Sequence, residues 1–544
     1  MAACADLLRP VVNHVPKIGL WVAIAIAAFV ISALAALVSF APTLEIAQIW
    51  NDPYYRHVTK FSFYQASLST LLSVGLAIPL AHALSRRQFP GRDLLIKIFA
   101  TTLVLPVLVG VFGLLAIYGN RGWLAKGLEQ FDLSLPFSIY GLNGILLAHV
   151  FFNLPYAARL LLQSLESIPQ EQHRLCAHLG MGHWYKFKWI EWPRLRQQLP
   201  HVCGLVFMLC FTSFATVMAL GGGPKSTTIE LAIYQAIKFD FDLQAGALLA
   251  LWQMLLCGFL AIGIQKLSKP MAVESGSKAR DNFVGKDHWW SKAWDSFWII
   301  GGVLLVIPPL MMVFVSGLNT QLWSVVSDWR FWQALATSLQ VAVMAAMMAL
   351  LLGFCILLTS RGWRMQLKNS RASLLELVGT IILVTPGLVI STGIFLLLRS
   401  VADVYSLAFW VVVCVNALMA LPYVIKSLAQ PMLHVGQQYQ LLCVSLGMTG
   451  WSRIHIVEWR ALKRPITHAF AISFMLSMGD LSAIALFGSQ DFRTLPLYLF
   501  QLLGSYQMEA AAVVSLALLL LSVGIFTVLE KLFVTSRSKH AKHH

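Results

Sequence analysis

Apolar and polar residues follow one another along the chain in long blocks. Twelve blocks are mostly apolar over about 20 residues, the length that a helix needs to cross a bilayer. Strands of a membrane barrel would instead alternate over about ten residues. The pattern predicts an all-α, polytopic transmembrane helical bundle of about 12 spans. The predicted spans are residues 18–41, 61–84, 94–118, 139–164, 199–220, 244–265, 294–317, 332–358, 374–398, 406–430, 466–487 and 510–533.

Composition supports the membrane interpretation. Of the 544 residues, 58% are hydrophobic and 12% are charged, whereas soluble domains have about 45–50% apolar and about 25% charged residues. The formal charge of +16 could suggest nucleic acid, but the basic residues lie in short loops rather than on one soluble face. The first apolar block exceeds a signal-peptide core and is interpreted as an uncleaved helix.

The distribution of Lys and Arg predicts the orientation. With a cytoplasmic N-terminus, nine of the 40 basic residues lie outside the cytoplasm and the other 31 lie in cytoplasmic segments or helix ends, including Lys97, Arg159 and Lys426. This excess is what the positive-inside rule requires. Both termini, and the long loops 165–198 and 431–465, are therefore expected in the cytoplasm.

The two long loops reveal an internal repeat with an offset of 267 residues. LCAHLGMGHW at 175–184 matches LCVSLGMTGW at 442–451, and Glu191 matches Glu458. Phe63 and its neighbours also echo Phe331, and Pro106 echoes Pro386. The repeat predicts a first permease half over 1–265, a cytoplasmic linker over 266–293 and a second half over 294–544, with a solute path between the halves.

Each loop offers residues for docking a partner. A short helix would place Leu175, Cys176 and Leu179 on one face, Gly180 would end it with positive φ, and Trp184 could anchor a partner. The residues alone fit docking and internal packing equally; duplication favours docking to two identical partners. The candidate docking residues are Arg174, Leu175, Cys176, Leu179, Gly180, Trp184, Leu441, Leu442, Cys443, Leu446, Gly447 and Trp451.

Several kinds of chemistry are missing from the sequence. The run at 221–227, GGGPKST, departs from a phosphate-binding loop because Pro224 interrupts the Gly-Lys step. No catalytic triad or metal cluster is recognisable, and metal binding by the tail residues His540, His543 and His544 is not expected. The cysteines form no C-x-x-C pair, so neither a zinc site nor a disulfide framework is predicted. We expect no catalytic residue, no metal and no cofactor bound by this chain.

The loops resemble the docking loop of ABC importer permeases, in which a Gly precedes a Pro by about thirteen residues, as Gly180 precedes Pro193. More closely, the chain resembles the thiamine and thiamine pyrophosphate permeases of binding-protein-dependent, type I ABC importers. Four stretches carry this resemblance: RRQFPGR at 86–92, HVFFNLP at 149–155, ALGGGPKSTTIELAIYQ at 219–235 and DFRTLPLYLF at 491–500.

The resemblance implies a permease with two fused transmembrane halves in the bacterial inner membrane. It implies two copies of a separate ATPase that uses ATP, a periplasmic thiamine-binding protein and surrounding membrane lipid as partners, and no nucleic acid. The sequence departs from the family loop at three places. Arg174 and Leu441 replace its Glu, Leu-Cys pairs replace its small residues, and Arg460 replaces the second Pro.

Polar residues inside predicted spans are candidates for the solute path. Asp480 lies in the eleventh span and matches Ser213, while His149 and Asn416 occupy corresponding places in the fourth and tenth spans. A carboxylate in the path could attract the positive thiazolium of thiamine, but a gating or packing role is the favoured interpretation of Asp480. For His149 and Asn416, hydrogen bonds between helices are the favoured interpretation.

Three alternatives stay open at this point. Ferric iron is the alternative substrate, because related fused permeases carry it. An ion-coupled secondary transporter is the alternative class, although Asp480 and Glu376 supply few buried acids for it. A scaffold without transport is the third. Uptake that requires the ATPase, ATP and the binding protein together would distinguish the ABC importer from the others.

Overall fold

A computed structural model describes residues 17–41, 50–102, 105–134, 136–267, 289–380, 385–401, 403–448 and 450–534. The regular structure within these ranges is helical throughout, which confirms the predicted all-α class. Most of the predicted linker and the three tail histidines lie outside the described residues.

The helices of the two sequence repeats follow the same order. Those of the first repeat are α2 (Ile18–Phe40), α4 (Pro53–Arg86), α5 (Arg92–Thr101), α6 (Val107–Tyr118), α7 (Trp123–Glu129), α8 (Leu142–Glu166), α9 (Gln170–His178), α10 (His183–Lys186), the π-helix η1 (Phe187–Glu191), α11 (Trp192–Phe211), α12 (Phe214–Leu220), the 3-10 turn η2 (Pro224–Ser226), α13 (Ile229–Lys238) and α14 (Leu243–Leu267). Those of the second are α15 (Trp289–Gly317), α16 (Leu322–Ser327), α17 (Trp329–Met365), α18 (Asn369–Thr380), α19 (Gly387–Val401), α20 (Val404–Ser445), α21 (Gly450–Arg453), the π-helix η4 (Ile454–Glu458), α22 (Trp459–Gly479), α23 (Ser482–Phe487), α24 (Leu495–Gly504) and α25 (Met508–Val534).

The described residues contain ten helices long and apolar enough to cross a membrane. The number is eleven if His183–Phe211 (α10 through α11) and Phe214–Leu220 (α12), bent by 52°, form one span. Two predicted spans are divided. Residues 94–118 form α5 and α6, and residues 374–398 form α18 and α19, with Pro106 and Pro386 beginning the second piece of each pair. Proline lacks a backbone N–H and disfavours helical backbone in the residue before it, so a break at these positions follows.

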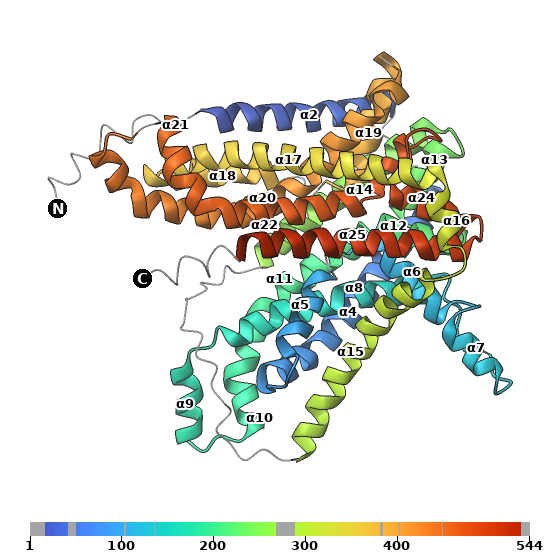
Figure 1. Ribbon diagram of the computed structural model, residues 1–544, viewed down its shortest axis with the longest axis horizontal. Coiled ribbons are helices and arrows are strands. Elements are labelled where there is room, and N and C mark those ends of the chain that lie inside the picture. Colours follow the sequence, from blue (N-terminus) through green and yellow to red (C-terminus); the bar gives the residue numbers. More distant parts are fainter. Residues whose placement is uncertain are drawn as a thin grey trace.

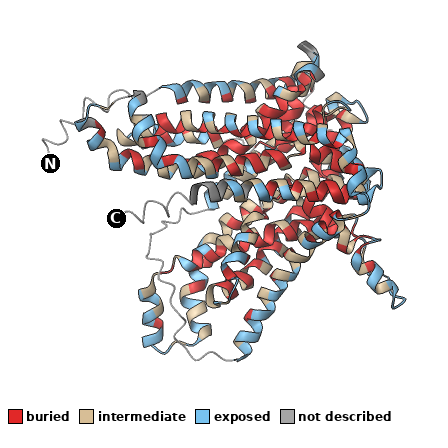
Figure 2. Ribbon diagram, in the orientation of Figure 1, coloured by how far each residue is buried: buried red, intermediate tan, exposed pale blue. Residues whose placement is uncertain are grey.

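The outer faces of the helices expose large apolar side chains, as a lipid-facing surface must. Trp21 on α2, Phe259 on α14 and Leu304 on α15 are all more than half exposed. A water-soluble monomer rarely carries such contiguous apolar surface. Figure 2 shows the buried residues gathered in the interior of the bundle, where the helices pack on one another. The protein is a multi-pass membrane protein.

The helices form two groups that converge at one end and diverge at the other (Figure 1). We call the divergent end, which carries α9, α10 and α21, the loop end, and the opposite end, near α13 and α24, the far end. At the far end, the ammonium of Lys238 on α13 donates hydrogen bonds to the carbonyls of Leu486 (3.1 Å) and Gly488 (3.3 Å) in the other repeat. The far end is therefore held together across the repeats.

The first long helix of each repeat packs against the other repeat. Helix α2 lies against α17, α18 and α19, and α15 lies against α4 and α6. Each of these two helices crosses its partner at a glycine. A Cβ on Gly393 of α19 would lie 2.4 Å from the carbonyl oxygen of Ala33 on α2. A Cβ on Gly113 of α6 would lie 2.5 Å from the carbonyl oxygen of Pro309 on α15. Such close backbone approach is common between membrane helices. The predicted halves, 1–265 and 294–544, therefore describe the repeat in the sequence and not the two packed groups of helices. Each group includes the first long helix of the other repeat, and we call α2 and α15 the exchanged helices.

One predicted repeat correspondence is wrong. Asp52 and Asp328 cap α4 and α17 in the same way, by accepting the N–H two residues later. Likewise Ser62 accepts the N–H of Ile229 (3.0 Å) and Ser338 that of Leu495 (2.7 Å). Both pairs differ by 276 residues, so Phe63 and Phe331, which differ by 268, are not equivalent. The number of residues between this helix (α4 or α17) and the long loop differs between the two repeats. The offset that relates the loops therefore does not relate these helices.

Candidate functional site

The first docking loop begins at a proline and turns at a glycine. Pro169 precedes α9, which ends in a Schellman turn where the N–H of Met181 bonds the carbonyl of Cys176 at 3.0 Å. Gly180 lies in this turn with φ +61°, a backbone conformation that is unfavourable for residues with a Cβ. The chain then continues through α10 and η1 into α11. The predicted helix and its glycine end are confirmed.

The second loop repeats this turn on a continuous helix. Helix α20 runs through the docking segment to Ser445, and the N–H of Met448 bonds the carbonyl of Cys443 at 2.8 Å. Gly447 has the same φ of +61°. Where the first loop has Pro169, the second has Gly436, which leaves α20 unbroken. The two loops therefore share a turn but differ in how they join their spans.

The leucines of both loops face outward and the cysteines face inward. Leu175 and Leu179 are 57% and 67% exposed, whereas Cys176 is 3% exposed. The expectation that all three share a face is wrong, because residues i and i+4 align on a helix while i+1 is turned away. In the second loop, the same arrangement holds for the exposed Leu441, Leu442 and Leu446 and the buried Cys443.

The remaining predicted docking residues are exposed where the structure describes them. Arg174 is exposed on α9, and Trp184 is exposed at the start of α10. The Trp451 side chain lies outside what is described. Each loop thus exposes leucines, and the first loop also exposes Trp184, as apolar side chains that a partner could cover.

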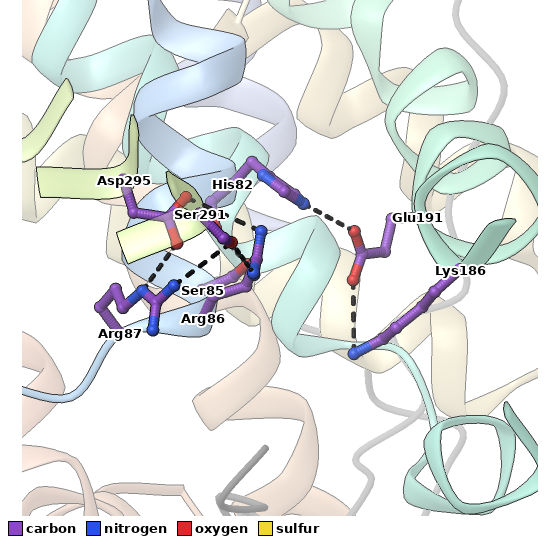
Figure 3. Close-up of polar contacts among 8 residues, drawn as sticks. All are labelled: His82, Ser85, Arg86, Arg87, Lys186, Glu191, Ser291 and Asp295. Atoms are coloured by element: carbon purple, nitrogen blue, oxygen red, sulfur yellow. Dashed lines mark hydrogen bonds and ion pairs between the residues drawn. The ribbon is translucent and has the colours of Figure 1, made fainter. Parts of the chain in front are cut away.

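Behind this surface, a buried glutamate ties the first loop to α4. Glu191 ends the π-helix η1 and is 4% exposed. Its carboxylate contacts the ammonium of Lys186 at 3.5 Å and a ring nitrogen of His82 at 3.0 Å (Figure 3). In a π-helix, backbone hydrogen bonds join residues five apart. Lys186 and Glu191 are five residues apart, so this geometry brings their side chains close together. The ring of Phe187 packs edge-on against the His82 ring, with centroids 5.1 Å apart.

The second loop carries the equivalent glutamate. Glu458 ends η4 and is 1% exposed. One of its oxygens accepts a hydrogen bond from Arg453 at 2.9 Å and forms an ion pair with the guanidinium of Arg361, also at 2.9 Å. Arg453 stands at the place of Lys186, and Arg361 comes from α17, the counterpart of α4. We call these two groups the first and second glutamate clamps.

Neighbouring ion pairs fix the loop ends of α4 and α17 to other helices. The guanidinium of Arg87, the residue after α4, bonds the buried Asp295 of α15 at 2.6 Å. The Ser291 hydroxyl accepts hydrogen bonds from both Arg86 and Arg87 (Figure 3). On α17, Arg364 bonds Glu376 of α18 at 2.8 Å. These contacts anchor the spanning helices but do not involve the docking loops.

Sequence reasoning matched Glu191 with Glu458 but did not assign them a role. A usable signal was present, since a basic residue stands five positions before each glutamate. Their partners His82 and Arg361 carried no comparable signal, because 109 residues separate His82 from Glu191. Only folding brings these side chains together.

The candidate path residues of the first repeat form one hydrogen-bond network. The ring nitrogens of His149 contact the hydroxyls of Ser69 (2.8 Å) and Ser213 (2.7 Å). His149 is buried, and Ser213 precedes α12 at the break between two helices. This geometry agrees with a hydrogen-bonding role for His149 between helices; a role in the path remains a prediction.

In the second repeat, the structure does not pair Asn416 with Asp480. The amide of Asn416 donates to the hydroxyl of Ser477 at 3.0 Å. The Asp480 carboxylate instead accepts from the Ser482 hydroxyl (2.8 Å) and the Ala483 N–H (3.3 Å) at the start of α23. No group of three or more His, Cys, Asp or Glu that could hold a metal ion occurs among the described residues.

Comparisons with known proteins place this architecture in a family. Residues 360–534 match the family model for the binding-protein-dependent transport system inner membrane component. The chain is 50% identical to the thiamine transport system permease protein ThiP of Escherichia coli (strain K12), over 94% of each chain. It is 40% identical to that of Haemophilus influenzae, over 90% of this chain and 91% of the relative. The chain therefore belongs to the family of thiamine transport system permease proteins, which are transport permease subunits and not enzymes.

Proposed function

We propose that this chain is the membrane-spanning subunit of an ATP-driven importer for thiamine and its phosphates. A periplasmic binding protein delivers the solute, and two copies of a separate ATPase dock on the loop end. The observation that carries the proposal is the duplicated apolar surface of the two loops, on a chain similar throughout its length to thiamine permeases. The loop end is cytoplasmic in this proposal, as the excess of basic residues supports.

Transport would follow from the divergent shape of the bundle. The helices spread at the loop end and are joined at the far end by Lys238. Closure of two ATPases on bound ATP would bring the loops together and open the far end to the binding protein. The chain itself forms no covalent intermediate and holds neither ATP nor a cofactor in this scheme.

Reconstitution tests the proposed function. Proteoliposomes containing the chain and its ATPase should take up labelled thiamine only when ATP is enclosed with the ATPase and the loaded binding protein is outside. Uptake driven by an ion gradient without ATP would refute the proposal in favour of a secondary transporter. Uptake of ferric iron in place of thiamine would refute the assigned substrate.

Docking can be tested separately from transport. Leu179→Asp combined with Leu446→Asp should reduce retention of the ATPase on the affinity-purified chain at least tenfold, because both exposed leucines lie on the docking surfaces. Leu267→Asp is the matched control, since Leu267 is equally exposed but ends α14 outside both loops. Equal retention by the double variant and the control would contradict docking at these leucines.

A further inference from the structure

The glutamate clamps connect the docking loops to helices that reach the far end. Glu191 bonds His82 near the loop end of α4, and Glu458 bonds Arg361 near the loop end of α17. At 1.5 Å per residue, the 34 residues of α4 span about 51 Å. Each clamp therefore acts on one end of a helix that crosses the whole molecule.

Toward their other ends, these helices hold the starts of α13 and α24 at the far end. The hydroxyl of Ser62 on α4 accepts the first N–H of α13, and the hydroxyl of Ser338 on α17 accepts the first N–H of α24. Helix α13 then ends at Lys238, whose ammonium joins the two repeats. A contiguous series of bonded elements thus leads from each loop to the far end.

The clamps are buried, whereas the docking leucines are exposed. The side chains of Glu191 and Glu458 are 5% and 1% exposed, so a docked ATPase would touch the leucines and not the carboxylates. Burial also makes the bonds strong and directional, because water does not compete for them. Movement of a loop would then carry α4 or α17 with it.

We propose that Glu191 and Glu458 are positioning residues that couple movement of the docking loops to α4 and α17, and through them to the far end. The inference rests on the proposed function, since it assigns a task to loops that the ATPase moves. The two clamps are unequal. Glu458 is held by two arginines, whereas Glu191 is held by one lysine and an imidazole.

Arg361→Gln tests the proposal with the least disturbance, because Glu458 keeps Arg453 within the loop. We expect unchanged retention of the ATPase, but at least a tenfold loss of ATP-driven uptake and of the stimulation of ATP hydrolysis by loaded binding protein. Arg364→Gln is the matched control: it lies one turn along the same helix and is also ion-paired, but to Glu376 of α18. The control should keep both activities within twofold of the unmodified chain.

A charge inversion gives an independent test. Glu458→Arg with Arg453→Glu keeps a pair inside the loop but turns like charges toward α17, so it should uncouple hydrolysis from uptake. Adding Arg361→Glu restores both contacts of residue 458 with reversed sign and should recover at least half of the uptake. Coupling by the clamp is refuted if Arg361→Gln transports normally, if it loses ATPase retention together with uptake, or if a folded triple variant fails to recover.

Uptake by the unmodified complex distinguishes failure of this inference from failure of the proposed function. If it shows no ATP-dependent uptake with its binding protein, the proposed function fails. If it transports and Arg361→Gln transports equally, the proposed function stands and only the coupling role fails.

Discussion

Asp480 occupies a break between two helices where the repeats touch. Its carboxylate accepts hydrogen bonds from the Ser482 hydroxyl and the Ala483 N–H, as a helix-capping residue does. Immediately before it, a Cβ on Gly479 would lie 2.9 Å from the Cα of Pro106 in the other repeat. Ser213 precedes α12 at the corresponding place, but its hydroxyl contacts His149 and does not cap that helix. The hydrogen bonds favour a structural role for Asp480 over attraction of a cation.

Two variants of Asp480 separate these roles. Asp480→Ala removes the cap of α23 and should destabilise the folded protein by about 0.5–2 kcal/mol, seen as a lower melting temperature in detergent. Asp480→Asn keeps a capping oxygen and removes the charge, so it should retain uptake close to that of the unmodified chain. If the Asn variant melts normally but transports as poorly as the Ala variant, the charge itself is required.

At the scale of the element, the docking turns could be predicted because their signals are local. Gly180 follows a short helix by the spacing of a helix C-terminus, and its positive φ is observed. The inward orientation of Cys176 was missed, because the sequence of a short helix in a loop does not reveal which side packs on the bundle. The contacts of Glu191 and Glu458 with α4 and α17 depend on the tertiary fold and were not predictable from spacing. His149 and Asn416 lie on helices as predicted, whereas Asp480 and Ser213 lie at breaks between helices, and the hydrogen-bond partners of all four could not be known from sequence.

The turn can be tested with two nearby glycines. A Cβ at Gly180 or at Gly182 would meet no atom within 4 Å, but only Gly180 has positive φ. Gly180→Ala should therefore strain the turn by roughly 1–2 kcal/mol and weaken ATPase retention several-fold. Gly182→Ala should leave retention unchanged. Equal retention by both variants would show that docking does not depend on the left-handed turn.

The crossings of the exchanged helices depend on glycine for a different reason. Gly393→Val would place a side chain against the backbone of α2 at Ala33, and overpacking of this kind costs roughly 1–3 kcal/mol. The variant should lower the melting temperature of the solubilised protein. Gly301→Val is the control, since a Cβ on Gly301 of α15 meets no atom within 4 Å. A Gly393 variant as stable as the control would argue against a tight crossing.

At the scale of the whole molecule, the bundle is closed at the far end and divergent at the loop end. Lys238 contributes to that closure by bonding two carbonyls at the end of α23. The counterpart helix α24 ends at Gly504 instead of a basic residue. The repeat thus predicted a near-symmetric molecule, while the closure at this point is asymmetric.

Removing the Lys238 ammonium should favour opening of the far end. A hydrogen bond from a charged donor is worth about 1.5–3 kcal/mol, so Lys238→Met should raise ATP hydrolysis in the absence of binding protein by roughly tenfold. Lys126→Met, an exposed lysine on α7, is the control. Basal hydrolysis equal to that of the control would mean that the Lys238 contact does not oppose opening.

The exchange of α2 and α15 sets the order in which the protein can be completed in the cell. Ala33 and the glycine that it contacts, Gly393, are 360 positions apart in the sequence. At a synthesis rate of roughly 5–20 residues per second, α2 would wait roughly 20–70 seconds for that partner. Its sequence contains no charged residue, so lipid alone can hold it during this time. The N-terminal repeat cannot mature before the C-terminal repeat emerges, and fusion into one chain ensures that each exchanged helix always finds its partner in the same membrane.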